Sequence, residues 1–216
     1  MLNRRVHMLA VIGLAALAAR PACAETAMEM LQRALAATQA VEDYTADVTV
    51  SVDSPNLQIP RRTVRVWYKR PDKVHVESSG ITVLPRDALL LGNLGRHIAE
   101  YAQASFNGSG TLNGRPVQSI KLTPIDAGPG TGRVLMWIDS ERYLLLKSEI
   151  WRGGAAMLTV NFTWAQVSGH WMPTRIVAEL AAGAMTGRDE GGRIEMTFAN
   201  YRVNAGIPDS VFEEDG

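Results

Sequence analysis

Apolar and polar residues alternate strictly in a stretch near the start of the chain. Tyr44, Ala46, Val48, Val50 and Val52 are each separated from the next by one polar residue. Because successive side chains of a β-strand point to opposite faces, this period of two predicts a strand with one dry face and one wet face. Similar runs predict further strands over residues 63–69, 73–78, 117–123, 133–138, 143–151, 157–167, 172–180 and 193–203.

Short turn signals separate most of these runs. Asn113-Gly114, Asp139-Ser140, Gly153-Gly154, Ser168-Gly169 and Gly191-Gly192 are typical of hairpin turns. Parallel pairing would need a long crossover between each pair of strands, and the chain leaves no room for one. The sequence therefore predicts a mainly β protein with a few helices, built as a strongly curved antiparallel meander.

Helical patterns occur in two places. Thr26 and Glu29 form a capping box, followed by apolar residues at helical spacing up to about Gln39. Between Leu84 and Ser109 the alternation breaks, and residues 87–91 and 95–106 have a weak helical pattern. We expect an opening helix and two short helices over the concave face of the sheet, with a pocket where they pack loosely.

The first 24 residues have the pattern of a secretory signal peptide. Arg4 and Arg5 precede an apolar run from Met8 to Ala19, and Ala22-Cys23-Ala24 matches a small-residue cleavage site. The run is too short for a transmembrane helix, which needs about 20 apolar residues. We expect cleavage after Ala24, export to the periplasm, and a single domain over residues 25–216.

Cys23 raises the alternative of a lipid anchor on the mature protein. A lipoprotein signal has an aliphatic residue three positions before the modified Cys, and Arg20 stands there instead. We therefore expect Cys23 to be removed with the signal peptide.

Composition and motifs narrow the function. With 22 basic and 22 acidic residues and no basic cluster, the chain lacks the electrostatics of a nucleic-acid-binding protein. Its one Cys cannot form a disulfide framework or a thiolate zinc site. His75, His97 and His170 lie far apart, and there is no G-x-S-x-G nucleophile motif. We expect no enzymatic activity, no metal and no cofactor.

Large apolar residues are concentrated in the predicted strands. All five tryptophans lie in these strands or directly beside them, and Leu144-Leu145-Leu146 is apolar on both faces of its strand. An ordinary core accounts for most of these residues. The functional alternative is that some line a cavity for an apolar ligand, for which large rings provide much contact area.

Two segments resemble the periplasmic outer-membrane lipoprotein carrier family, LolA, and its relatives. Trp67-Tyr68-Lys69-Arg70-Pro71, followed by the alternating residues 73–77, is similar to the W-x-K-R-P segment of that family. Residues 196–212 are similar to its closing strand and D-x-x-F signature, here Asp209 to Phe212. Residues 79–85 depart from the family pattern, and so does the end of the chain at 213–216.

The resemblance implies an unclosed β-barrel with an N-terminal helix and short lid helices over a hydrophobic cavity that accepts acyl chains. Trp67 and Arg70 match the motif Trp and the Arg whose hydrogen bonds hold the lid shut, and Arg70 is expected to bond carbonyls of residues 84–106. The expected ligand-binding residues of the cavity and lid are Trp67, Arg70, Val74, Val76, Leu84, Leu89, Leu90, Leu91, Ile98, Phe106, Trp137, Leu146 and Phe162.

The function implied is that of a periplasmic carrier, or chaperone, for an acylated lipoprotein or lipid cargo moving toward the outer membrane. Its partners would be transfer proteins of the inner and outer membranes, and no nucleic acid. The alternative is a periplasmic sensor of the same fold that detects lipids or lipoproteins. A hydrolase or isomerase ranks third, since no cluster of acid, base and nucleophile is visible in the sequence.

Overall fold

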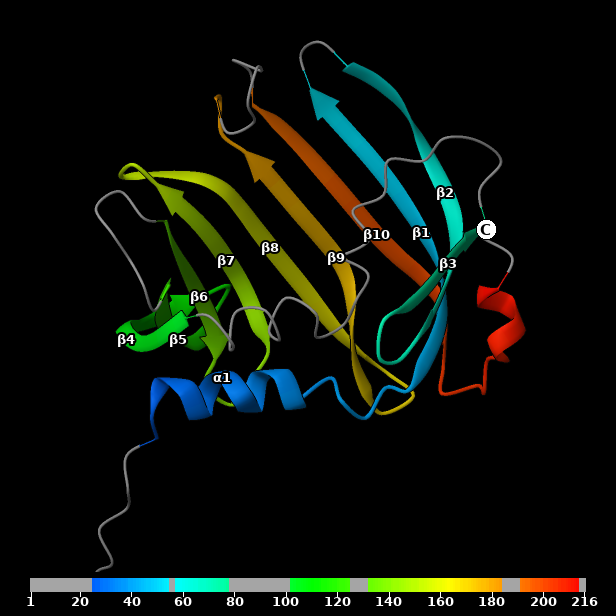
Figure 1. Cartoon of the computed structure of the whole chain (residues 1–216), viewed down its shortest axis with the longest axis horizontal. Helices are drawn as coiled ribbons and strands as arrows, with labels where there is room; N and C mark the ends of the chain where they lie inside the picture. Colours follow the sequence, from blue (N-terminus) through cyan, green and yellow to red (C-terminus); the bar gives the residue numbers. More distant parts are fainter. Residues whose placement is uncertain (1–24, 55–56, 78–101, 125–131, 184–190, 214–216) are drawn as a thin grey trace, which may run out of the picture.

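All the strands that the structure describes belong to one curved antiparallel sheet that does not close on itself (Figure 1). The structure is a computed structural model and describes residues 25–54, 57–77, 102–124, 132–183 and 191–213. The elements in chain order are α1 (Ala27–Ala36), β1 (Asp43–Ser54), β2 (Leu57–Lys69), β3 (Lys73–Glu77), β4 (Ala102–Leu112), β5 (Arg115–Pro124), β6 (Arg133–Asp139), β7 (Leu145–Arg152), β8 (Ala155–Val167), β9 (His170–Leu180), β10 (Gly192–Val203) and the 3₁₀ helix η1 (Asp209–Phe212). The predicted fold class, an unclosed β-barrel with an N-terminal helix, is confirmed.

The strand order is not a single meander. It runs β3-β2-β1-β10-β9-β8-β7-β6-β5-β4, so two sets of sequential hairpins join where β1 pairs with β10. β3 and β4 follow one another along the chain, yet they form opposite edges of the sheet. The first and last strands therefore lie side by side in the middle of the sheet (Figure 1).

One predicted helix is wrong in its described part. Residues 102–106 were expected to end a helix, but they begin strand β4, which pairs with β5 from Ala102↔Pro124 to Leu112↔Arg115. Ala104 and Phe106 do alternate with Gln103 and Ser105, as a strand requires. Pairing with β5 decides the conformation of a segment whose small residues have no strong local preference. The predicted helix at 87–91 lies outside the described residues.

The opening helix forms as its sequence predicts. The Thr26 amide donates to the Glu29 carboxylate at 2.8 Å, and the Glu29 amide donates to the Thr26 hydroxyl at 3.2 Å. These two bonds satisfy amides that a helix N-terminus otherwise leaves without partners. α1 buries Ala27, Met30 and Leu31.

A buried carboxylate fastens the chain beyond β10 to the start of β1. Asp43 accepts hydrogen bonds from the amides of Ala205 at 2.8 Å, Gly206 at 3.0 Å and Ile207 at 3.2 Å. This segment leads into η1, which lies beside β3 (Figure 1). Asp209 of η1 accepts a bond from Lys69 at 2.6 Å and pairs with Lys73 of the edge strand at 3.3 Å.

Candidate functional site

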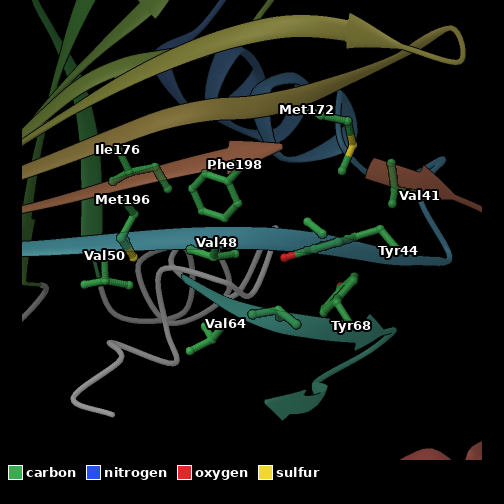
Figure 2. Close-up of a cluster of buried hydrophobic side chains, with 12 residues drawn as sticks. Val41, Tyr44, Val48, Val50, Val64, Tyr68, Met172, Ile176, Met196 and Phe198 are labelled. Carbon is green, nitrogen blue, oxygen red and sulfur yellow. The ribbon is translucent and has the colours of Figure 1, made fainter. Parts of the chain in front are cut away.

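One face of the sheet, here called the inner face, is apolar on strand after strand. Val48 of β1 pairs with Val64 of β2 on one side and with Phe198 of β10 on the other. A second row, in register across four strands, consists of Val50, Met196, Ile176 and Phe162. Figure 2 shows side chains of β1, β2, β9 and β10 meeting in one cluster on this face.

Helix α1 covers part of the inner face. Met30 and Leu31 pack with Ile120 of β5 and with Met136 and Ile138 of β6, and each of these residues is at most 3% exposed. Arg33 of α1 donates a hydrogen bond to the Tyr143 hydroxyl at 2.8 Å, which ties the helix to the β6–β7 connection. The helix therefore shields these apolar side chains from solvent.

The inner face continues beyond this covered part as a partly exposed surface. We define the apolar strip as the residues Val52, Ile150, Leu158, Val160, Ala178, Leu180 and Ile194. Ile150 pairs with Leu158, which in turn pairs with Leu180. Val160 likewise pairs with Ala178, and Ile194 lies between Ala178 and Val52. None of the seven is fully buried, and Ile150 is 41% exposed.

The apolar strip spans β1 and β7 to β10 without a polar side chain at any of these positions. Leaving adjacent apolar side chains in contact with water is unfavourable, at about 25 cal/mol per Å². A contiguous, incompletely buried apolar surface on the inside of a curved sheet is a feature that an apolar ligand can cover. The strip is the candidate functional site.

The opposite, outer face carries charges in pairs. Arg175 donates to Glu195 at 2.7 Å, Lys147 lies 2.6 Å from Glu149, and Arg65 donates to Asp47 at 2.9 Å. The hydrogen bond from Arg175 holds the pKa of the Glu195 carboxyl below its ordinary value. The outer face therefore remains ionised and hydrated at neutral pH, whereas the apolar strip contains no charged side chain.

Some of the expected ligand-binding residues lie on the inner face. Val74 and Val76 of β3 and Phe162 of β8 are half-buried and pack against the cluster of Figure 2. Phe106 of the edge strand β4 pairs with the inner-face residue Ile120 and is 45% exposed. Leu146 is buried in a separate cluster with Val117 and Leu144.

The two expected tryptophans lie on the outer face. Trp67 alternates with the buried Val66 and Tyr68 and packs edge-to-face against His75 of β3, with ring centroids 5.2 Å apart. Trp137 alternates with the buried Met136 and Ile138, and the Lys147 ammonium lies 4.7 Å from the centre of its ring. Strand alternation thus directs both rings away from the apolar strip.

The remaining expected lid residues, Leu84, Leu89, Leu90, Leu91 and Ile98, lie outside the described residues. The Arg70 guanidinium donates a hydrogen bond to the carbonyl oxygen of Gln39, in the segment after α1. The Arg70 amide donates to the Glu42 carbonyl at 2.8 Å. Arg70 thus has a backbone carbonyl as acceptor, on a segment other than the expected residues 84–106.

Sequence reasoning did not single out the apolar strip. The signal was present in the alternation of Leu158, Val160 and Phe162 with Thr159 and Asn161. Such a pattern identifies the apolar face of a strand, but it does not distinguish a fully covered face from a half-exposed one.

In the described part of the chain, no three His, Cys, Asp or Glu side chains are grouped so that they could hold a metal ion. Among the same residues, no helix has both the length and the apolar character needed to span a bilayer.

Three solved structures resemble this one closely in shape. A protein of the DUF1329 family from Desulfovibrio piger has a TM-score of 0.65 at 14% identity, over 87% of this chain and 96% of that one. A domain from Vibrio parahaemolyticus described as an outer membrane lipoprotein-sorting protein has a TM-score of 0.62 at 16% identity, over 88% and 97%. A LolA superfamily protein from Nitrosomonas europaea has a TM-score of 0.56 at 15% identity, over 89% and 99%.

Sequence comparison adds a family assignment. No curated protein matches the chain. One family model, described as "Uncharacterized protein", matches residues 91–216, which is more than half of the chain. At identities this low, the solved structures establish the fold and not the ligand. The chain thus belongs to the family that this model describes, and its fold is LolA-like, as the sequence motifs indicated.

Proposed function

We propose that this protein is an exported carrier that holds the acyl chains of lipoproteins or other lipids on its inner face and carries them toward the outer membrane. The observation that supports this function best is the apolar strip, which continues in register across β7 to β10 and β1 while remaining partly exposed. Its fold is similar to that of a domain described as an outer membrane lipoprotein-sorting protein, which favours the same function. The carrier performs no bond chemistry.

The strength of binding follows from the area that an acyl chain covers. Full burial of one CH₂ group contributes about 0.8 kcal/mol, which is about a fourfold change in affinity. A chain of moderate length therefore binds firmly and can still be released to a partner. The proposed partners are transfer proteins at the inner and outer membranes.

The test is a displacement assay with a fluorescent fatty-acid probe and saturated fatty acids of increasing length. We expect affinity to rise with every added CH₂ until the strip is covered, and to change little with salt. Ile150→Glu should weaken binding at least tenfold, because it places a carboxylate on the strip at a position where solvent exposure lets the sheet tolerate it.

The control is Thr163→Glu, on β8 but on the outer face, where its cross-strand partner is Arg175. This variant should bind like the unmodified protein. Affinity that ignores chain length, or that is equal in Ile150→Glu and the unmodified protein, would contradict the proposed site.

Export is part of the same proposal. The signal-peptide pattern of residues 1–24 indicates that the mature chain begins at Glu25 as a single periplasmic domain. N-terminal sequencing of the protein purified from periplasm should read Glu-Thr-Ala-Met. A mature chain that starts at an acylated Cys23 would instead make the protein a membrane-anchored lipoprotein.

A further inference from the structure

A pocket of about 520 Å³ lies on the outer face, separate from the apolar strip. We call it the outer pocket, and its lining residues are Thr45, Arg65, Trp67, Asn200, Tyr201 and Arg202. Thr45 and Trp67 alternate along their strands with the buried residues Tyr44, Ala46, Val66 and Tyr68. The body of the sheet therefore separates this pocket from the inner face.

The pocket forms where the pairing of β1 with β10 is irregular. Across the three strands, Trp67 pairs with Thr45, and Thr45 pairs with Arg202. The register shifts between Thr45 and Asp47, and Asn200 there has a φ of 55°. Asn adopts this left-handed conformation more readily than most residues, and a bulge of this kind bends a strand locally.

Tyr201 holds the bulge in place from the inner side. Its hydroxyl donates to the Pro173 carbonyl at 2.6 Å, and its ring stacks on Phe198 with centroids 6.1 Å apart. Both contacts lie within the core of the sheet. The irregular backbone beneath the pocket is therefore held by tertiary contacts, which favours a preformed pocket.

One cation of the pocket has no ion-pair partner among the described residues. Arg65 donates to one oxygen of Asp47 at 2.9 Å, and the Asn200 side-chain amide donates to the other at 2.7 Å. Glu77 of β3 pairs opposite Arg65 and adds a second negative charge beside it. Within the described ranges, no carboxylate lies at ion-pair distance from Arg202, which lines the same pocket. The Arg202 guanidinium is therefore the cation that is available to a bound anion.

An aromatic surface lies opposite this charge. Trp67 and Arg202 flank Thr45 in one cross-strand row, and the Trp67 ring is held by its edge-to-face contact with His75. A guanidinium suits the oxygens of a phosphate or carboxylate, and an indole packs well against a flat group. The volume of about 520 Å³ falls within the usual range for small-molecule sites.

We propose that the outer pocket binds a small aromatic anion, a phosphate ester or a carboxylate, with its oxygens on Arg202 and its ring against Trp67. This site is independent of the proposed acyl-chain site, because it lies on the other face and recognises charge. Binding here should weaken with salt, unlike binding to the apolar strip.

The experiment is a titration of the full mature chain, followed by the indole N–H resonance of Trp67, which a Trp67→Phe variant assigns. Phenyl phosphate and benzoate are the probes, and they distinguish a phosphate ester from a carboxylate. Inorganic phosphate tests the charge without the ring, and benzyl alcohol tests the ring without the charge. We expect phenyl phosphate, benzoate or both to bind at least tenfold more tightly than either partial probe.

Arg202→Gln should weaken that binding roughly tenfold or more, as expected for the loss of a charge-assisted hydrogen bond. The matched control is Arg62→Gln, an exposed cation of β2 outside the pocket, which removes the same charge without changing binding. Ile150→Glu should leave phenyl phosphate binding intact. Equal affinity for inorganic phosphate, equal affinity in Arg202→Gln, or no shift of the Trp67 resonance with any probe would each overturn the proposal.

Discussion

The Asp43 carboxylate offers a direct test of how the end of the chain is held to the sheet. Asp43 is 4% exposed and accepts three backbone amide hydrogen bonds, from Ala205, Gly206 and Ile207. The perturbation is Asp43→Ala, which removes the acceptor and leaves the three amides in place. These amides lie on the segment that leads to η1, so their release should also loosen the contact of η1 with the edge strand β3.

The magnitude follows from the surroundings of each amide. Ile207 is buried, so its amide loses its partner without gaining water, at a cost of about 1–3 kcal/mol. Ala205 and Gly206 are exposed, and their amides can be hydrated, so each loses only the net value of its bond, about 1 kcal/mol. We expect Asp43→Ala to lower the free energy of unfolding by about 3–5 kcal/mol.

The assay is urea unfolding followed by tryptophan fluorescence at pH 7. Asp43→Asn keeps one carbonyl oxygen and should cost less than Asp43→Ala. Asp53→Ala, an exposed carboxylate on the same strand, should change stability by no more than about 0.5 kcal/mol. An Asp43→Ala protein within about 1 kcal/mol of the unmodified chain, or one no less stable than Asp43→Asn, would refute the reasoning.

Two further predictions concern other contacts. Burial raises the pKa of Asp139, but hydrogen bonds from Arg115 and from backbone amides outweigh this effect. The pKa of Asp139 therefore lies below its ordinary value. The stabilisation by the ionised carboxylate should be complete above about pH 4, and it should be lost as the pH falls through the lower pKa of the folded state. Urea unfolding midpoints should therefore show that Asp139→Asn is much less stable than the unmodified protein at pH 7, and that the difference is smaller at pH 3. An equal difference in midpoint at both pH values would contradict the idea that the ionised carboxylate is the source of the stability. Arg70→Leu removes the hydrogen bond to the Gln39 carbonyl. This variant should speed amide hydrogen exchange in residues 37–42 without changing the circular dichroism spectrum. Exchange as slow as in the unmodified protein would show that the bond does not hold this segment.

The strands and the opening helix could be predicted because their signals are local. The alternation in residues 44–52 places every second side chain on one face, and all the even-numbered residues from Tyr44 to Val50 are buried. The Thr26–Glu29 capping box forms as expected. The first part of strand β4, residues 102–106, was mistaken for helix because its conformation depends on β5, and local spacing does not reveal that partner.

The candidate site was harder to predict for a related reason. The family resemblance directed attention to Trp67, and the apolar content of the strands to Trp137, but alternation with buried neighbours places both on the outer face. The residues of the apolar strip have the same pattern as residues in a fully covered core. Among the described elements, α1 distinguishes the two, since it packs on Ile120 and Met136, whereas Val160 packs against the cluster of Figure 2 and remains partly exposed.

By itself, the sequence determined that this chain forms amphipathic antiparallel strands and an opening helix, because hydrophobic periodicity, capping and turn residues act over a few neighbours. The LolA-like fold was indicated by the resemblance of two segments to that family. The tertiary structure alone decided that β1 pairs with β10, that β3 and β4 become the two edges, and that part of the apolar face stays half-exposed. It also placed Trp67 and Arg202 in one row across three strands. These features depend on contacts between residues far apart in the chain. A local sequence pattern does not reveal the free energy of such contacts.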